Sequence, residues 1–136
     1  MTAQIPESYR DLLEGPVVVS LITVMPDGQP QATPVWCTYD GEHIIVNTAR
    51  GRQKDRNMQR DPKVTVLAID PKNPYRYLEV RGRVEEHTEK DGVEMINRLS
   101  ALYTGNPDYY STNPAMRQQE QRVTYKIRPV RVIASG

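Results

Sequence analysis

The sequence predicts a mainly β protein of the α+β class, in which six antiparallel strands form a closed or split barrel with a few short helices. Three observations predict this class. Runs rich in Val, Ile and Thr recur along the chain, tight-turn signals join the first runs as hairpins, and the two helical segments do not alternate regularly with strands as they do in a parallel α/β sheet. The length of 136 residues fits one domain over residues 1–136.

The first three strands are expected within the first 48 residues. Residues 16–25, PVVVSLITVM, are rich in β-branched side chains and are bounded by prolines, a pattern typical of a buried strand. Pro26-Asp27-Gly28 turns the chain into a second strand over 29–39, and Asp40-Gly41 leads into a third over 44–47. We expect these three strands to form a meander.

Two further strands follow a short helix. At 52–61, Gln, Lys, Arg, Asn and Met replace the β-branched residues, so a polar helix is expected to end before Pro62. Strands are expected at 63–70 and at 75–86, and the second has one exposed face because charged and apolar residues alternate along it.

A second helix and a last strand complete the chain. Thr88 and Asp91 have the spacing of a capping box. The apolar residues after them have helical spacing, and they are Val93, Ile96, Leu99, Ala101 and Leu102. After a loop rich in Gly, Asn and Pro, residues 122–135 are expected to form the sixth strand, in which Pro129 requires an edge position or a bulge.

Composition excludes several classes of function. Eighteen basic and seventeen acidic residues give a net charge of +1, so the chain as a whole does not attract nucleic acid or an anionic membrane. Residues 1–15 lack the basic end and apolar run of a signal peptide, and no apolar stretch approaches the roughly 20 residues that span a bilayer. The single cysteine, Cys37, excludes an internal disulfide. We therefore expect a cytoplasmic protein that binds neither nucleic acid nor membrane.

The apolar content points to self-association. Val, Ile and Leu are few and Phe is absent, so the chain is close to the composition at which folding alone becomes marginal. A six-stranded barrel also has little interior space, so a ligand is expected on its outside or in a seam between two copies.

Positive charge is concentrated at 50–63, RGRQKDRNMQRDPK, which holds six basic and two acidic residues. A glycine, a loop and a first helical turn bring N–H donors and cationic heads together, which suits a phosphate group. A solvated polar helix is the alternative interpretation, because most charge clusters are that. Neither a GxGxxG nor a Walker motif occurs here.

A second feature is a proline within the second strand, in 31–36, QATPVW. The proline breaks the ladder, which either frees main-chain groups for a planar heterocycle or makes an ordinary bulge. Trp36 fits the core as well as a cofactor contact, and the tyrosines near 75–77 and 103–110 fit ring stacking as well as volume filling.

No catalytic constellation is present in the sequence. His43 and His87 are 44 positions apart, and Cys37 has no evident base. We expect both histidines on the surface, a buried Cys37 and no metal site.

Residues 17–70, from VVVSLITVM to KVTVLAID, resemble the first half of the pyridoxamine 5'-phosphate oxidase-like split-barrel superfamily. VRGRVEE, LSALY and YKIRP further along also match, so the resemblance covers nearly the whole chain. It implies a six-stranded antiparallel split barrel of the FMN-binding type that works as a homodimer with its cofactor site at the subunit interface.

Within that superfamily, NTARGRQKDRN at 47–57 and RDP at 60–62 are similar to the flavin and deazaflavin oxidoreductases that use coenzyme F-420. Two departures separate the chain from the FMN oxidases. Gln53 stands between Arg52 and Lys54, where FMN oxidases carry an adjacent Arg-Lys pair, and the oxidases' C-terminal substrate motif does not follow Arg131. FMN is therefore the second cofactor candidate.

The resemblance also implies which residues bind the coenzyme. Arg52 and Lys54 would hold its phosphate, with Arg56 as a third cation. The deazaflavin and ribityl chain would lie beside Thr33, Pro34, Val35 and Trp36. The next strand would offer main-chain contacts from Asn47, Thr48 and Ala49. Tyr75 falls where relatives place an aromatic residue from the other subunit.

The resemblance implies hydride transfer from reduced coenzyme to an unsaturated or quinone-like small molecule. Because the reactive carbon belongs to the coenzyme, no protein nucleophile is needed and the catalytic residues are not identified. Two alternatives keep the fold: an FMN-dependent oxidoreductase and a carrier that binds the deazaflavin without catalysis.

Overall fold

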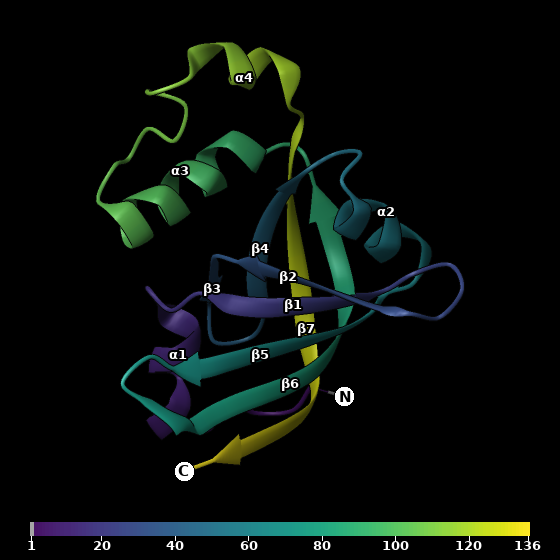
Figure 1. Ribbon diagram of the computed structural model, residues 1–136, viewed down its shortest axis with the longest axis vertical. Helices are drawn as coiled ribbons and strands as arrows, with labels where there is room; N and C mark the ends of the chain where they lie inside the picture. Colours follow the sequence, from purple (N-terminus) through teal and green to yellow (C-terminus); the bar gives the residue numbers. More distant parts are fainter. Residues whose placement is uncertain (1) are drawn as a thin grey trace.

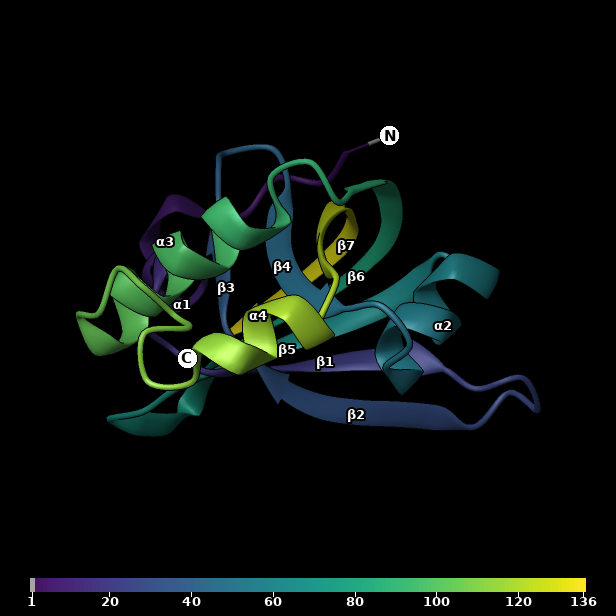
Figure 2. The same ribbon diagram turned by 90° about the horizontal axis from the view of Figure 1, so that it is seen from above.

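The computed structural model describes residues 2–136, in which one antiparallel sheet of seven strands curls into a split barrel with short helices around it (Figures 1 and 2). The elements are η1 Glu7–Tyr9, α1 Asp11–Glu14, β1 Val19–Val24, β2 Pro30–Val35, β3 Cys37–Tyr39, β4 Ile44–Ala49, α2 Gln53–Arg60, β5 Lys63–Asp70, β6 Asn73–Thr88, α3 Gly92–Thr104, α4 Pro114–Gln119 and β7 Arg122–Ser135. Their order in the sheet is β2-β1-β5-β6-β7-β4-β3. The predicted fold class is confirmed, with seven strands in place of six.

The extra strand comes from a break at Trp36. The segment expected to be one strand over 29–39 is divided into β2, which pairs with β1, and β3, which pairs with β4 at the opposite edge of the sheet. The expected meander is therefore wrong. Because one residue joins the two edges, the sheet has to curl, and β2 and β3 run at a steep angle to each other (Figure 2).

Both predicted tight turns are present. Gly28 donates its N–H to the Met25 carbonyl at 2.8 Å, and the Asp27 carboxylate accepts the Gln29 N–H at 3.0 Å. Gly28 has φ +90°, a conformation that glycine adopts without steric cost. In the second turn the Asp40 carboxylate accepts the N–H of Glu42, as aspartate does in Asx turns.

The core has two parts. The barrel interior holds the larger cluster, which includes the fully buried Tyr125, so this tyrosine fills core volume in a chain without Phe. A smaller cluster of Ile45, Met95 and Leu99 lies between β4 and α3, with Trp36 and Tyr103 packed against it. α3 thus covers one side of the barrel (Figure 1).

The predicted second helix is confirmed, but its start is not. α3 begins at Gly92, and no side-chain cap bonds its first turn. Thr88 instead ends β6 and accepts the Lys90 N–H at 3.1 Å, so the expected capping box is wrong. Ile96 and Leu99 face the core, whereas Ala101 and Leu102 are exposed. α4 was not expected, because it is short and has no buried residue.

Pro129 lies at a bulge in the second half of β7. Arg81 of β6 pairs with Arg131 of β7, and Gly82 pairs with Pro129, so Val130 is the extra residue. Both expected features are present, because the β4–β7 ladder covers only Arg122 to Ile127, and at Pro129 β7 has β6 as its one strand neighbour within residues 2–136. No helix in residues 2–136 is long and apolar enough to cross a membrane.

The single cysteine and one of the two histidines have the burial that the sequence predicts. Cys37 is buried as expected, and burial raises the pKa of its thiol to about 12. His87 is exposed as expected, but His43 is buried, and its Nε2 lies 2.9 Å from Glu85 Oε1.

Candidate functional site

A cleft of about 290 Å³ opens between α3, the break at Trp36 and the start of α2. Its walls combine an apolar and aromatic side with a cationic side. The lining residues are Val18, Pro34, Val35, Trp36, Asn47, Arg52, Lys54, Ile96, Leu99, Tyr109 and Arg122.

Three cations come together at this cleft from two distant parts of the chain. Arg52 directly precedes α2, Lys54 lies in the first turn of α2, and Arg122 opens β7 with only 2% of its surface exposed. The pairing of β4 with β7 aligns Ala49 with Arg122, which brings the end of the sequence to the basic segment.

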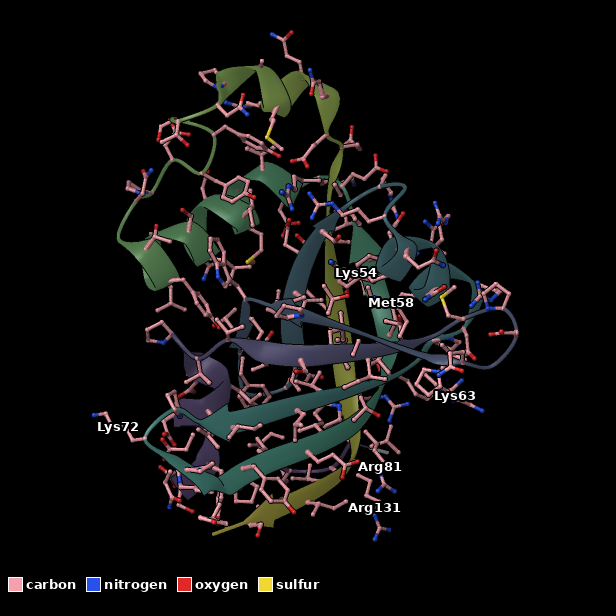
Figure 3. All side chains as sticks on the ribbon, in the orientation of Figure 1. Lys54, Met58, Lys63, Lys72, Arg81 and Arg131 are labelled. Atoms are coloured by element: carbon pink, nitrogen blue, oxygen red, sulfur yellow. The ribbon has the colours of Figure 1, made fainter. Side chains whose placement is uncertain are left out.

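A single carboxylate balances these cations in part. Glu120 lies 2.7 Å from Arg52 and 3.0 Å from Arg122. Lys54 has no hydrogen-bond or ion-pair partner among residues 2–136, and in Figure 3 it lies on the side of α2 nearest β4. The cluster therefore has a net charge of +2.

Burial, followed by repulsion from Arg52 and Arg122, lowers the pKa of the Lys54 ammonium. A half-buried cation beside two other cations is unfavourable in the free protein. An anion bound between these groups would relieve both costs, so the arrangement is suited to an anionic ligand.

The aromatic wall is built around Trp36. Tyr103 stacks on it with ring centres 5.3 Å apart, and Tyr109 meets it edge-on at 6.0 Å. Trp36 thus packs against the α3 cluster and also lines the cleft, which joins the two roles that the sequence left open.

Tyr103 also binds the main chain at the break. Its hydroxyl accepts the Cys37 N–H at 3.0 Å and donates toward the carbonyl oxygens of Val17 and Cys37 at 2.7 and 3.0 Å. The main-chain groups of Cys37, just after the segment in which free groups for a heterocycle were one of two alternatives, are therefore bonded within the protein.

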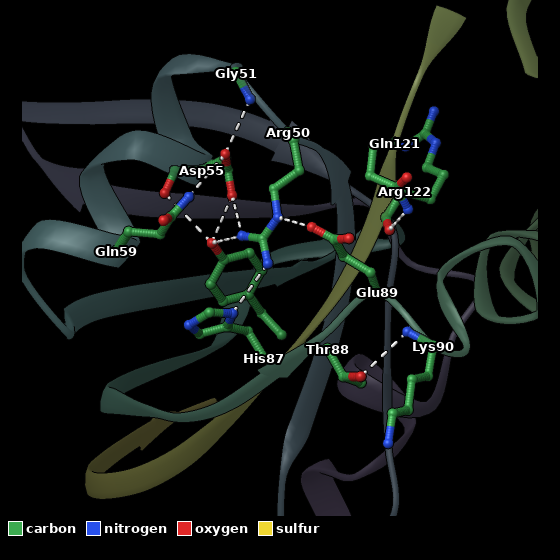
Figure 4. A network of polar contacts seen from close by, with 11 residues as sticks. Arg50, Gly51, Asp55, Gln59, His87, Thr88, Glu89, Lys90, Gln121 and Arg122 are labelled. Carbon is green, nitrogen blue, oxygen red and sulfur yellow. Dashed lines mark hydrogen bonds and ion pairs between the residues drawn. The ribbon is translucent and has the colours of Figure 1, made fainter. Parts of the chain in front are cut away.

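A buried network fixes the turn that presents Arg52 (Figure 4). The Asp55 carboxylate accepts hydrogen bonds from Arg50 Nη1 and Gly51 N–H, both at 2.9 Å, and from the Tyr125 hydroxyl at 2.6 Å. Burial raises the pKa of Asp55, but these hydrogen bonds outweigh it and lower the pKa below its ordinary value. Arg50 is thus a structural cation, and the basic segment is not simply a solvated helix.

Six of the predicted coenzyme-binding residues line the cleft, and they are Pro34, Val35, Trp36, Asn47, Arg52 and Lys54. The side chain of Asn47 is engaged with the protein, since its Nδ2 donates to the Gly92 carbonyl at 2.9 Å. The β3–β4 ladder ends at the pair Cys37 and Val46, so beyond it no strand within residues 2–136 covers that edge of β4.

The other five predicted residues do not line the cleft. Thr33 bonds Gln31, and Thr48 and Ala49 have buried side chains. Arg56 is exposed and donates to the Gly51 carbonyl at 2.7 Å. Tyr75 is 81% exposed in the turn region of β6.

Sequence reasoning missed five lining residues, which are Val18, Ile96, Leu99, Tyr109 and Arg122. Arg122 has no local signal, because it is a single arginine at a strand start whose place at the cleft depends on the β4–β7 register. Tyr109 lies in a loop, and its ring stacks under the Arg122 guanidinium at 4.9 Å.

A split barrel with a partly buried cationic cluster beside an aromatic cleft has the charge and shape that suit an anionic organic ligand. The family model for pyridoxamine 5'-phosphate oxidase matches residues 5–136, and the chain belongs to this family of oxidoreductases.

Solved structures agree with this assignment. An F-420 reductase is 38% identical, with a TM-score of 0.82 over 95% of this chain and 98% of that one. A conserved hypothetical protein of Mycobacterium tuberculosis is 26% identical, with a TM-score of 0.73 over 98% and 86% of the two chains. The haem storage protein of Vibrio cholerae shares the fold alone, at 15% identity and a TM-score of 0.68 over 98% and 96%.

Proposed function

We propose that the protein is a coenzyme F-420-dependent oxidoreductase that transfers a hydride from the reduced deazaflavin to an unsaturated or quinone-like small molecule. The observation that carries the proposal is Lys54, a half-buried cation without a partner in residues 2–136, which lines an aromatic cleft together with Arg52 and Arg122. The similarity to an F-420 reductase over nearly the whole chain supports the choice of coenzyme.

The residues present fit such a coenzyme. Arg52 and Lys54 would hold its phosphate, because charge-assisted hydrogen bonds to phosphate are strong and both cations reach the same cleft. Pro34, Val35 and Trp36 would lie against the ring system, and the uncovered edge of β4 at Asn47, Thr48 and Ala49 would offer main-chain groups to it. Thr33 would contact the ribityl chain from β2, and Arg56 would be an outer cation.

The coenzyme supplies the hydride when it is bound. The protein then has to bind and orient the coenzyme and the substrate and to exclude water from them. Trp36 and Leu99 form an apolar surface of the cleft that suits this role.

A second copy of the chain completes the site in this proposal. The cleft lies at the protein surface, and Tyr75 is a large aromatic side chain that is 81% exposed on β6. We propose a homodimer in which Tyr75 of one subunit covers the coenzyme of the other. A cytoplasmic location, where Cys37 stays reduced, is part of the same proposal.

Two other candidates use the same cleft. FMN also carries a phosphate for Arg52 and Lys54 to hold, so an FMN-dependent oxidoreductase is the second candidate. A carrier that binds deazaflavin without catalysis is the third, and the fold it shares with a haem storage protein is consistent with ligand binding alone.

The test is a parallel fluorescence titration of cofactor-stripped protein with F-420 and FMN at moderate salt. Tight F-420 binding with weak FMN binding supports the proposal, and turnover of reduced F-420 with a panel of enones and quinones separates the enzyme from the carrier. The reverse preference would make the protein a flavin enzyme, and failure to bind either would refute the proposed site.

A further inference from the structure

The carboxylate of Glu120 is the only negative charge placed against the cation cluster within residues 2–136. One oxygen lies 2.7 Å from Arg52 and the other 3.0 Å from Arg122, so the group bridges the two arginines. The Tyr110 hydroxyl donates to it at 2.6 Å. Its position is therefore fixed from three sides.

Glu120 is ionised when the site works. Burial raises the pKa of its carboxyl, but the hydrogen bond from Tyr110 and the charges of Arg122 and Arg52 outweigh burial and lower that pKa. Only 12% of the Glu120 side chain is exposed, so solvent screens its charge weakly. An anion that binds between Arg52 and Lys54 consequently meets a fixed negative charge close by.

Repulsion between fixed charges scales with the charge of the ligand. A phosphomonoester carries close to two negative charges near neutral pH, whereas a phosphodiester carries one. The carboxylate therefore disfavours the monoester about twice as strongly as the diester. F-420 holds its phosphate as a diester and FMN holds it as a monoester, so the effect bears directly on which coenzyme is bound.

We propose that Glu120 is a specificity-determining residue, whose carboxylate between Arg52 and Arg122 biases the cleft toward phosphodiester ligands and against phosphomonoesters. This inference rests on the proposed function only in taking a phosphate to lie beside Arg52 and Lys54.

The experiment compares two ligands that share one ring system, FMN and its methyl phosphodiester, on the wild type and on Glu120→Gln. Loss of the carboxylate is expected to improve FMN binding relative to the diester by about tenfold, since a weakly screened charge acts on one extra ligand charge. A structural defect would weaken both ligands alike and would leave the ratio of their dissociation constants unchanged. An unchanged ratio would overturn the proposal.

Glu79→Gln is the matched control. Glu79 lies 2.7 Å from Arg81 on β6, so the substitution removes the same charge and the same kind of ion pair away from the cleft. The ratio is expected to keep its wild-type value in this variant, and an equal shift would mean that overall charge, not Glu120, sets the preference.

Glu120→Gln leaves the buried Arg122 without its carboxylate, so a second variant covers failure to fold. Glu120→Gln combined with Arg122→Gln removes the pair together and restores the net charge of the cluster. The ratio of the two dissociation constants should return to its wild-type value in this variant, and a ratio that differs from wild type would contradict the charge argument.

The same variants distinguish the two proposals. If neither flavin nor F-420 binds the wild type, the proposed function fails, and methyl phosphate and dimethyl phosphate replace the flavins in the ratio measurement. A shift toward methyl phosphate in Glu120→Gln would then support the role of Glu120 alone, and absence of binding by either ion would refute that role as well.

Discussion

Lys54 is the residue whose replacement most clearly separates a ligand-binding role from a structural one. Lys54→Met keeps much of the apolar stem and removes the charge. In the free protein the pKa of Lys54 is lowered by burial and by two arginines, which means that its charged form costs stability below that pKa. The variant is therefore expected to be as stable as the wild type or slightly more stable at pH 7, in spite of losing a half-buried side chain.

Coenzyme affinity is expected to change in the opposite direction. A hydrogen bond to a charged group contributes about 1.5 to 3 kcal/mol, so its loss should weaken F-420 binding by about 10- to 150-fold. Thermal unfolding and fluorescence titration of the same preparations measure both quantities. Lys63→Met is the control, since Lys63 is an exposed lysine at the start of β5 that does not line the cleft and lies apart from Lys54 in Figure 3.

Stability and coenzyme affinity of Lys54→Met together test whether Lys54 binds the ligand. Unchanged affinity would remove Lys54 from the site. A loss of stability with unchanged affinity would show that the ammonium has a structural partner, which contradicts the unbalanced cation cluster.

The remaining predictions concern the supports of the site and its pH dependence. Asp55→Asn should lower the free energy of unfolding at pH 7 by about 2 to 4 kcal/mol in urea titrations, because Arg50 loses a buried charged partner. The pKa of Asp55 is depressed in the folded protein, so the stabilisation by its carboxylate is present above about pH 4 and is lost as the pH falls through the folded pKa. The stabilities of wild type and variant should therefore converge in acid. Tyr103→Phe should cost about 1 to 3 kcal/mol by leaving the Cys37 N–H unpaired, with a change in the emission of Trp36 as the readout. Gly82→Ala should destabilise the protein by about 1 to 3 kcal/mol in chemical denaturation, because the new Cβ would lie 2.7 Å from Ile127 Cγ2 and 2.8 Å from the Arg128 carbonyl oxygen. Gly28→Ala is the comparison, since its Cβ would have no atom within 4 Å and the variant meets only the cost of a positive φ. F-420 affinity should weaken with rising pH at a lower pH than an ordinary lysine would give, and Lys54→Arg should remove that dependence because arginine stays protonated.

The strands and turns followed from the sequence because their signals are local. β5 and β7 have the predicted bounds, and the Asp27 and Asp40 turns were identified from two or three residues each. The topology did not follow, because nothing local shows that the chain changes edges at Trp36. The change of edge depends on long-range strand pairing, because β2 pairs with β1 and β3 pairs with β4 at the opposite edge of the sheet.

The candidate site was predictable in part for the same reason. Arg52 and Lys54 lie within one short basic segment, so their proximity to each other is fixed by the helix start. Arg122 and Glu120 are almost 70 residues away, and only the β4–β7 register brings them to the cleft. Arg50 and Arg56 show the limit of a charge count, since both are used in hydrogen bonds within the protein.

The central claim is that the phosphate of a deazaflavin coenzyme lies between Arg52 and Lys54, with its ring against Trp36. A crystal structure of the complex with F-420 tests this most directly. The account predicts phosphate oxygens within hydrogen-bond distance of Lys54 Nζ and the ring within van der Waals contact of Trp36. A coenzyme bound elsewhere, with Lys54 still unpaired, would contradict it.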